Sequence, residues 1–162
     1  MIRRFSFAVA ALATAAAMAG CTSTVTRSID LDPDNVAEVE LYFYDVSSAI
    51  PNEITRTTIV DAGLIAELVD TFVDIPGASI DDPQEEVQGA RATGIRFVLD
   101  DGSTVDMTQY YIDHASGVIA WPDGEVLYTE WGLPFEDYYL DSGDKVTVDA
   151  AERPVSPLET AG

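Results

Sequence analysis

Cys21 is the only cysteine among the 162 residues of the chain, so no disulfide can form within the molecule. Small exported domains that cannot build a sufficient hydrophobic core often rely on disulfides instead. This chain must therefore be stabilised by burying its own apolar side chains. Residues 36–148 are numerous enough for one such core, since typical domains have about 100 to 150 residues. We expect a single domain over this range.

The first 20 residues have the layout of a secretory signal. Arg3 and Arg4 give a basic start, an apolar stretch runs from Phe5 to Met18, and small residues precede Cys21. Secretory signals share this order of basic region, apolar region and small-residue cleavage site. The apolar stretch is shorter than the roughly 20 residues that a membrane-spanning helix requires. The sequence therefore predicts a signal peptide that is removed on export, ending at residue 20.

The end of this signal, Met18-Ala19-Gly20-Cys21, resembles the lipobox of bacterial lipoprotein precursors. In that family, signal peptidase II cuts before the cysteine, whose sulfur carries a diacylglyceryl group. The new amine is acylated as well in many species, with an acyl chain such as palmitate. The resemblance covers residues 1–21 and implies a lipid-anchored protein on the extracytoplasmic face of the cell membrane. It implies no cofactor beyond the lipid and leaves the globular domain without a family.

Two other export routes stay open. Cleavage after Ala15-Ala16-Ala17 would release a secreted protein in which Cys21 is a free thiol. Arg3 and Arg4, followed by Phe5, also fit a twin-arginine signal. For the lipidated form, the number of chains matters, because one acyl chain holds a protein reversibly whereas two or more hold it stably.

The exported chain is strongly acidic. Loss of Arg3 and Arg4 leaves six basic residues against 29 acidic ones, a net charge of −23. Nucleic acid is excluded as a partner, because binding its phosphates requires clustered lysines and arginines. An anionic bilayer would also repel the domain. Residues 21–35 are polar and are predicted to form a flexible tether with a mean reach of about 20 Å, well beyond the screening length of about 8 Å.

Alternating and β-branched residues predict most of the domain to be strands. Residues 36–46 place Val39, Leu41 and Phe43 on one side and polar or tyrosine side chains on the other, which indicates a half-buried strand. Further strands are predicted at 54–60, 95–99, 105–111, 118–121, 125–130 and 145–148, with Asp-Gly turns between the middle ones.

One helix is predicted over residues 62–73, because apolar residues recur at helical spacing after Asp61, a suitable N-cap. Pro76 and Gly77 are expected to end this element. The tail over 149–162, with two prolines, is predicted to be disordered. The expected fold class is α+β, an antiparallel sheet packed with one main α-helix.

No catalytic residue and no metal site is predicted. His114 lies in an expected turn without a G-x-S-x-G nucleophile motif. Zinc prefers cysteine and histidine ligands, of which the chain has one each. The acidic run 100–106 fails the EF-hand pattern, because position 111 holds tyrosine rather than glutamate. We interpret it as a hairpin turn and the acidic residues 81–86 as a solvated loop.

The clearest candidate for binding is aromatic, since eight of the fifteen aromatic residues lie between residues 110 and 139. On one sheet face they would form a platform for a sugar, a peptide or a cationic group. The alternative is that they complete the core, because tyrosine and tryptophan are common in strands. The candidate ligand-binding residues are Trp121, Trp131, Tyr128 and Tyr138.

These observations favour a non-enzymatic, lipid-anchored binding or interaction module of the bacterial envelope, whose partner is another envelope protein or a glycan. An envelope hydrolase that uses carboxylates, with or without calcium, is the alternative. It requires two acids that converge in one apolar-walled pocket. A third possibility is a structural or inhibitory lipoprotein that acts through its sheet face, which a continuous exposed apolar patch would favour.

Overall fold

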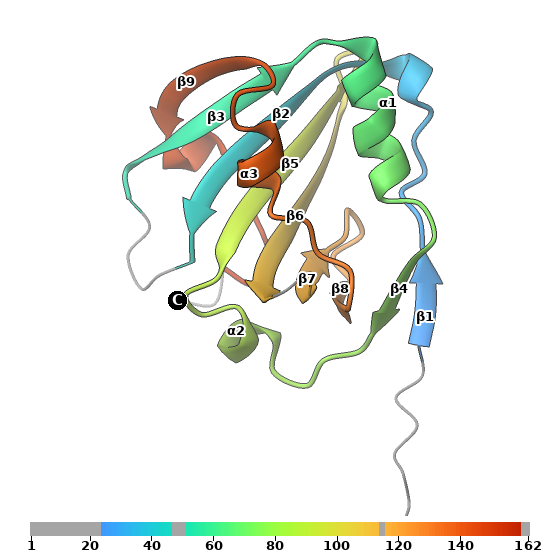
Figure 1. Ribbon diagram of the computed structural model, residues 1–162, viewed down its shortest axis with the longest axis vertical. Helices are drawn as coiled ribbons and strands as arrows, with labels where there is room; N and C mark the ends of the chain where they lie inside the picture. The colour runs from blue at the N-terminus through green and yellow to red at the C-terminus, as the bar shows by residue number, and fades with distance from the viewer. Residues whose placement is uncertain (1–23, 47–50, 114–115, 160–162) are drawn as a thin grey trace, which may run out of the picture.

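The computed structural model describes residues 24–46, 51–113 and 116–159. Within these ranges nine strands form one antiparallel sheet in the order β1-β4-β8-β7-β6-β5-β2-β3-β9 (Figure 1). Their bounds are β1 Thr24–Arg27, β2 Val36–Asp45, β3 Glu53–Ile59, β4 Ile75–Ala78, β5 Arg91–Leu99, β6 Thr104–Asp113, β7 Ser116–Ala120, β8 Val126–Thr129 and β9 Asp144–Asp149.

The described residues contain three short α-helices, α1 Ala62–Thr71, α2 Pro83–Glu86 and α3 Phe135–Tyr139, with 3₁₀ turns at Pro33–Asn35 and Ala150–Glu152. The prediction of an α+β fold is therefore wrong, and the domain is mainly β. Helix α1 lies where the sequence predicts it, and the Asp61 carboxylate accepts a hydrogen bond from the Leu64 N–H. However, it has only ten residues, and the sheet dominates the architecture.

The predicted hairpins are confirmed. β2 pairs with β3, β5 with β6, and β7 with β8, each antiparallel. Gly102 and Gly124, in the turns of the last two hairpins, have φ angles of 81° and 86°. Glycine adopts this left-handed backbone without steric cost, and tight hairpin turns require it. Local turn chemistry thus fixes the registers at the centre of the sheet.

One face of the sheet, here the helical face, carries Val39, Leu41, Phe43, Ile95 and Phe97 and is covered by α1, α3 and the segment between β8 and β9. Phe72, at the end of α1, stacks on Phe135 of α3 with ring centroids 5.7 Å apart. The Thr57 hydroxyl donates to the Leu140 carbonyl oxygen over 2.7 Å. The helical face is the principal hydrophobic core.

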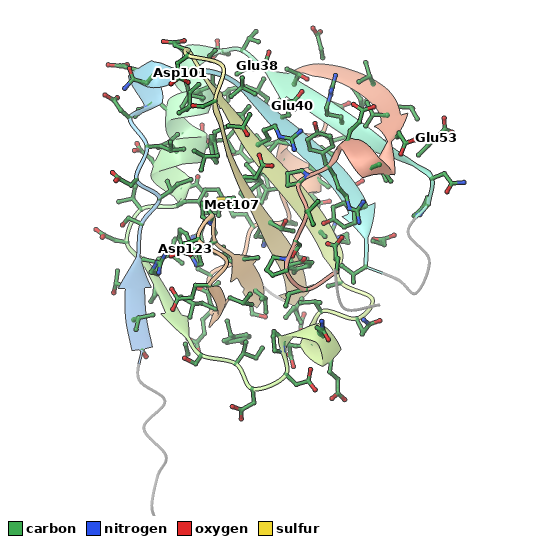
Figure 2. The ribbon with its side chains drawn as sticks, turned by 180° about the vertical axis from the view of Figure 1, so that it is seen from behind. Glu38, Glu40, Glu53, Asp101, Met107 and Asp123 are labelled. Carbon is green, nitrogen blue, oxygen red and sulfur yellow. The ribbon has the colours of Figure 1, made fainter. Side chains whose placement is uncertain are left out.

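The opposite face, here the tail face, carries Tyr42 and Tyr44 of β2, Ala92 of β5, and Tyr110 of β6. The sequence predicts Tyr42 and Tyr44 to lie on the solvent side of a half-buried strand, yet Tyr42 is only 1% exposed. The reason is the C-terminal segment, which crosses this face (Figure 2). Residues 149–159 are therefore ordered against the sheet, and the prediction of a disordered tail needs correction for them.

The N-terminal end of the described chain differs in the same way from the predicted tether over 21–35. Residues 24–27 form the edge strand β1, which pairs with β4 from Thr24↔Ala78 to Arg27↔Ile75. Ile29 is buried, and its N–H donates to the Phe72 carbonyl oxygen over 2.9 Å. The folded part of the chain thus begins no later than Thr24. Cys21 and the signal box at 18–20 lie outside the described residues.

Candidate functional site

A cleft with a volume of about 580 Å³ lies where β4 and β8 meet. These two antiparallel strands pair at one position only, Ala78↔Tyr128. Residues 76–81, Glu86, 128–130 and Thr24 of β1 line the cleft.

The lining of this cleft, here the β4–β8 cleft, combines apolar and acidic groups. Pro76 and Ile80 supply apolar surface, and Tyr128 adds an aromatic ring. Three carboxylates, those of Asp81, Glu86 and Glu130, also line the cleft, whereas no lysine or arginine does. Such a lining suits a ligand that offers hydroxyl or positively charged donors beside an apolar surface.

Strand β1, whose Thr24 lines the cleft, also carries a basic residue, Arg27. The charge of Arg27 is already paired with carboxylates. Its guanidinium donates to Asp123 over 2.7 Å and also contacts Glu125, both in the turn between β7 and β8. The hydrogen bond from Arg27 lowers the pKa of the Asp123 carboxyl. The Arg27 guanidinium lies 5.4 Å from the centroid of the Trp121 ring. These contacts join β1 to the β7–β8 hairpin rather than offering a cation to a ligand.

The same pairing holds for every lysine and arginine in the described ranges. Each of these six side chains has a carboxylate oxygen within 4.0 Å. A polyanion such as a nucleic acid requires a cluster of basic side chains to neutralise its phosphates. Within the described residues, no such unpaired cluster is present.

Two of the four aromatic candidates, Trp121 and Trp131, belong to the core. Trp121 is 3% exposed and meets Phe72 edge to face, with ring centroids 6.5 Å apart. Trp131 is half-buried and lies 5.9 Å from Phe72. Both rings therefore pack beneath the cover of the helical face, as the core alternative describes.

The other two candidates lie apart from them. Tyr128 is half-buried and lines the β4–β8 cleft, and it packs against the cluster of the tail face. Tyr138 is 64% exposed on α3, beside an open depression that includes Arg91 and Asp137. The four aromatic residues therefore do not form one platform on a sheet face, and of the four only Tyr128 lines the β4–β8 cleft.

The acidic run 100–106 forms a hairpin turn, as predicted. Asp101 accepts hydrogen bonds from the Ser103 N–H over 2.8 Å and from the Ser103 hydroxyl over 2.6 Å. These bonds lower the pKa of the Asp101 carboxyl. Among the described residues, no group of three or more His, Cys, Asp or Glu side chains is placed to hold a metal ion. His114 lies outside them.

The tail face holds a charged network that the sequence analysis missed. Arg96 of β5 donates to both carboxylate oxygens of Asp106 over 2.9 and 3.0 Å, and Arg56 of β3 lies 3.1 Å from Glu40 of β2. The Tyr42 hydroxyl donates to Glu40 over 2.7 Å, and burial with this hydrogen bond raises the pKa of Tyr42 to about 12. One signal for it is the placement of arginines inside strands, at positions that alternate with apolar residues.

Comparison of the chain with protein-family models, with curated proteins and with solved structures finds no match. In the described part of the chain, none of the helices has the length and apolar character needed to span a bilayer. The site must therefore be interpreted from its own geometry.

Proposed function

We propose that this protein is a lipid-anchored extracytoplasmic lipoprotein that acts as a binding module of the cell envelope, with the β4–β8 cleft as its ligand site. The observation that carries the proposal is the position of Thr24. This residue begins β1 and lines the cleft, and it follows the lipobox cysteine by three positions. The anchor and the cleft therefore belong to the same end of the molecule.

The short connection places the cleft close to the bilayer. Three peptide steps from Cys21 to Thr24 span at most about 11 Å. A diacylglyceryl group on Cys21 thus holds the open end of the cleft near the lipid headgroups. The domain carries a large negative charge, which an anionic surface repels within about 8 Å at physiological salt. This repulsion favours an orientation in which the domain stands away from the surface on its N-terminal end.

The lining of the cleft favours a glycan or a protein segment as the ligand. Carboxylates such as Asp81 and Glu130 accept hydrogen bonds from hydroxyls or ammonium groups, and the ring of Tyr128 offers an apolar surface for stacking. The absence of lysine and arginine from this lining disfavours anionic ligands. An envelope glycan or a basic patch of an envelope protein meets these requirements.

The anchor is tested by intact mass spectrometry of the membrane fraction, with a Cys21→Ser variant as the matched control. The expected result is a mature chain that begins at Cys21 and carries the added mass of a diacylglyceryl group. The variant should lack this mass and leave the membrane fraction. An unmodified parent chain recovered from the culture fluid would contradict the proposal.

The cleft is tested by comparing two tyrosine variants. Tyr128→Ala removes the ring in the cleft, while Tyr138→Ala removes an exposed ring on α3. We expect Tyr128→Ala to lower retention of the protein on purified envelope glycan by about tenfold or more, the loss of one good aromatic contact. Tyr138→Ala should leave retention unchanged. Equal retention of both variants and the parent would exclude glycan binding in this cleft.

The carboxylate hydrolase stays a second candidate, because three acids line a cleft that also has apolar walls. Hydrolysis of a glycosidic bond requires an acid and a second carboxylate at a fixed separation. Asp81→Asn and Glu130→Gln preserve the shape of the cleft and remove one acid each. If the protein is a hydrolase, one of these variants should stop release of reducing ends from envelope glycan. If neither the parent nor the variants release reducing ends, the binding function is the candidate that remains.

A further inference from the structure

The C-terminal segment, residues 150–159, lies on the tail face without joining the sheet as a strand. Over residues 154–157 the side chains alternate between the sheet and solvent. Pro154 and Ser156 are buried, whereas Val155 between them is 78% exposed. A 3₁₀ turn precedes this stretch at Ala150–Glu152, and a turn in which the Glu159 N–H donates to the Ser156 carbonyl oxygen follows it.

The face has a seat for the first proline of this segment. Gly94 of β5 lies beneath Pro154, and a Cβ atom at position 94 would be 2.9 Å from Pro154 Cδ, too close for two carbon atoms. The Tyr42 side chain borders the same point, with its Cβ 3.6 Å from the position of that added atom. Glycine at position 94 is therefore required for the proline ring to approach the strand.

The face also has a site for a carboxylate. The Glu159 side chain is only 8% exposed. The Tyr44 hydroxyl donates to Glu159 Oε1 over 2.6 Å, and the Tyr110 hydroxyl lies 3.0 Å from the same oxygen and in contact with Ser156 Oγ. Arg153 donates to Glu159 Oε2 over 2.6 Å. A buried carboxylate needs such donors, and two of them belong to the sheet.

Contacts from two arginines support the same interpretation. Arg56 and Arg96 belong to this face, although the molecule as a whole is strongly acidic. Arg96 Nη1 donates to the Glu152 carbonyl oxygen over 3.0 Å, and Arg56 Nη1 lies 3.5 Å from the Glu152 carboxylate. Both arginines also pair with carboxylates of the sheet, Arg56 with Glu40 and Arg96 with Asp106. The tail face thus offers N–H donors, phenol hydroxyls and a proline seat to a segment that carries proline and glutamate.

The segment has the composition of a polyproline-type ligand, Arg153-Pro154-Val155-Ser156-Pro157-Leu158-Glu159. Arg153 has φ −64° and ψ 157°, close to the polyproline II conformation. Pro-x-x-Pro segments in this conformation bind grooves lined by aromatic side chains. Because the segment makes no strand pairing, it can leave the face without breaking the sheet.

We propose that the tail face is a binding groove for segments of the Pro-x-x-Pro-x-Glu type, and that the chain's own C-terminal segment occupies this groove until a partner protein supplies a segment of the same chemistry. The groove is on the sheet surface and is distinct from the β4–β8 cleft. The partner is recognised by a proline over Gly94 and by a carboxylate between Tyr44 and Tyr110.

The test uses the full chain and a fluorescent peptide with the sequence of residues 150–162. In the parent, the chain's own segment competes with the peptide. Glu159→Ala weakens that competitor and leaves the groove unchanged, so we expect this variant to bind the peptide about ten- to a hundredfold more tightly, the range given by loss of a hydrogen-bonded charge. A peptide with alanine in place of Glu159 should not show this gain in affinity.

Two further variants keep the test decisive. Glu159→Gln preserves the side-chain shape and should give a smaller gain in affinity of the same sign. Gly94→Ala combined with Glu159→Ala should abolish peptide binding, because the added methyl group fills the proline seat. Circular dichroism and thermal unfolding verify that each variant is folded.

Three results would overturn the proposal. The first is a Glu159→Ala chain that releases its segment, as shown by amide hydrogen exchange, yet does not bind the peptide. The second is loss of the whole fold in both Glu159 variants, which would make the segment an inseparable part of the domain. The third is a dimer that exchanges C-terminal segments between copies, which would make a second copy the occupant.

Discussion

The two faces of this sheet are covered in different ways. The helical face is covered by elements from the middle of the chain, which stack aromatic rings such as Phe72 and Phe135 on aliphatic strands. The tail face is covered by the last residues of the chain, which are held by hydrogen bonds from Tyr44 and Tyr110 to one carboxylate. The first cover continues into strands of the sheet, whereas the second makes no strand pairing. The comparison separates a core of stacked rings from a cover held by hydrogen bonds to tyrosines.

The largest expected effect lies on the helical face. Phe72→Ala removes a fully buried ring that contacts Trp121, Trp131 and Phe135. We expect the free energy of unfolding to fall by about 3–5 kcal/mol, the usual cost of truncating a buried phenylalanine. Urea denaturation followed by tryptophan fluorescence measures it. A loss below 1 kcal/mol would show that this face is not the principal core.

A smaller effect is expected from Tyr44→Phe on the tail face. The substitution keeps the ring and removes the hydroxyl that donates to Glu159 over 2.6 Å. Loss of a hydrogen bond to a charged group costs about 1.5–3 kcal/mol. Because the segment makes no strand pairing, we also expect faster proteolytic cleavage within residues 150–159, with the sheet intact. Uniform loss of protection from proteolysis across the sheet would instead show that the two faces unfold as one cooperative unit.

Raising the pH should destabilise the two faces to different extents, because their buried tyrosines ionise. Burial raises the pKa of Tyr42, Tyr44 and Tyr110 on the tail face, and of Tyr139 on the helical face. A tyrosine whose pKa is raised on folding stabilises the fold fully below pH 10 and loses that contribution as pH rises through its folded pKa.

For Tyr42 and Tyr139 the folded pKa is about 12, so stability should fall between pH 10 and 12. Absorbance at 295 nm measures tyrosine ionisation, and hydrogen exchange reports which face opens first. We expect the tail face to open at lower pH, because three of the four affected tyrosines lie there. Simultaneous opening of both faces, or ionisation of all tyrosines near pH 10, would contradict this expectation.

The smallest expected effect comes from a surface ion pair next to the helical face. Arg91 donates to Asp137 over 2.8 Å, and both side chains are well exposed. Exposed ion pairs contribute about 0–1 kcal/mol because water and salt screen them. Asp137→Asn should therefore change the urea midpoint only slightly, less than either core substitution. It serves as the baseline against which the effects on the two faces are judged.

The sequence predicts the centre of the sheet because its signals are local. Asp-Gly turns and alternating residues specify the β5–β6 and β7–β8 hairpins, and Asp61 marks the start of α1. The β1 edge is different, since β1 pairs with β4 across about 50 residues, and neither four-residue strand has a clear alternation. Pro76 and Gly77 signal a helix end, yet both lie within β4. Non-local pairing thus overrides local propensity at these positions.

The candidate site was missed for a related reason. The β4–β8 cleft exists because two strands that are distant in sequence meet at one pair of residues, which no local pattern predicts. The tyrosines of β2 look solvent-facing from their alternation with apolar residues, and only the return of the C-terminal segment buries them. Tyr128 is the one predicted aromatic residue that the structure places in the cleft. Its strand position is predictable, but its neighbours are not.

The two-stranded ribbon of β1 and β4 has a mechanical consequence if lipid is attached at Cys21. Any tension between the membrane and a bound partner would enter the domain through β1. That ribbon pairs with its neighbouring strand β8 at a single residue position, and the ion pairs of Arg27 join it to the turn between β7 and β8. We therefore expect it to separate from the sheet under load before the central strands do.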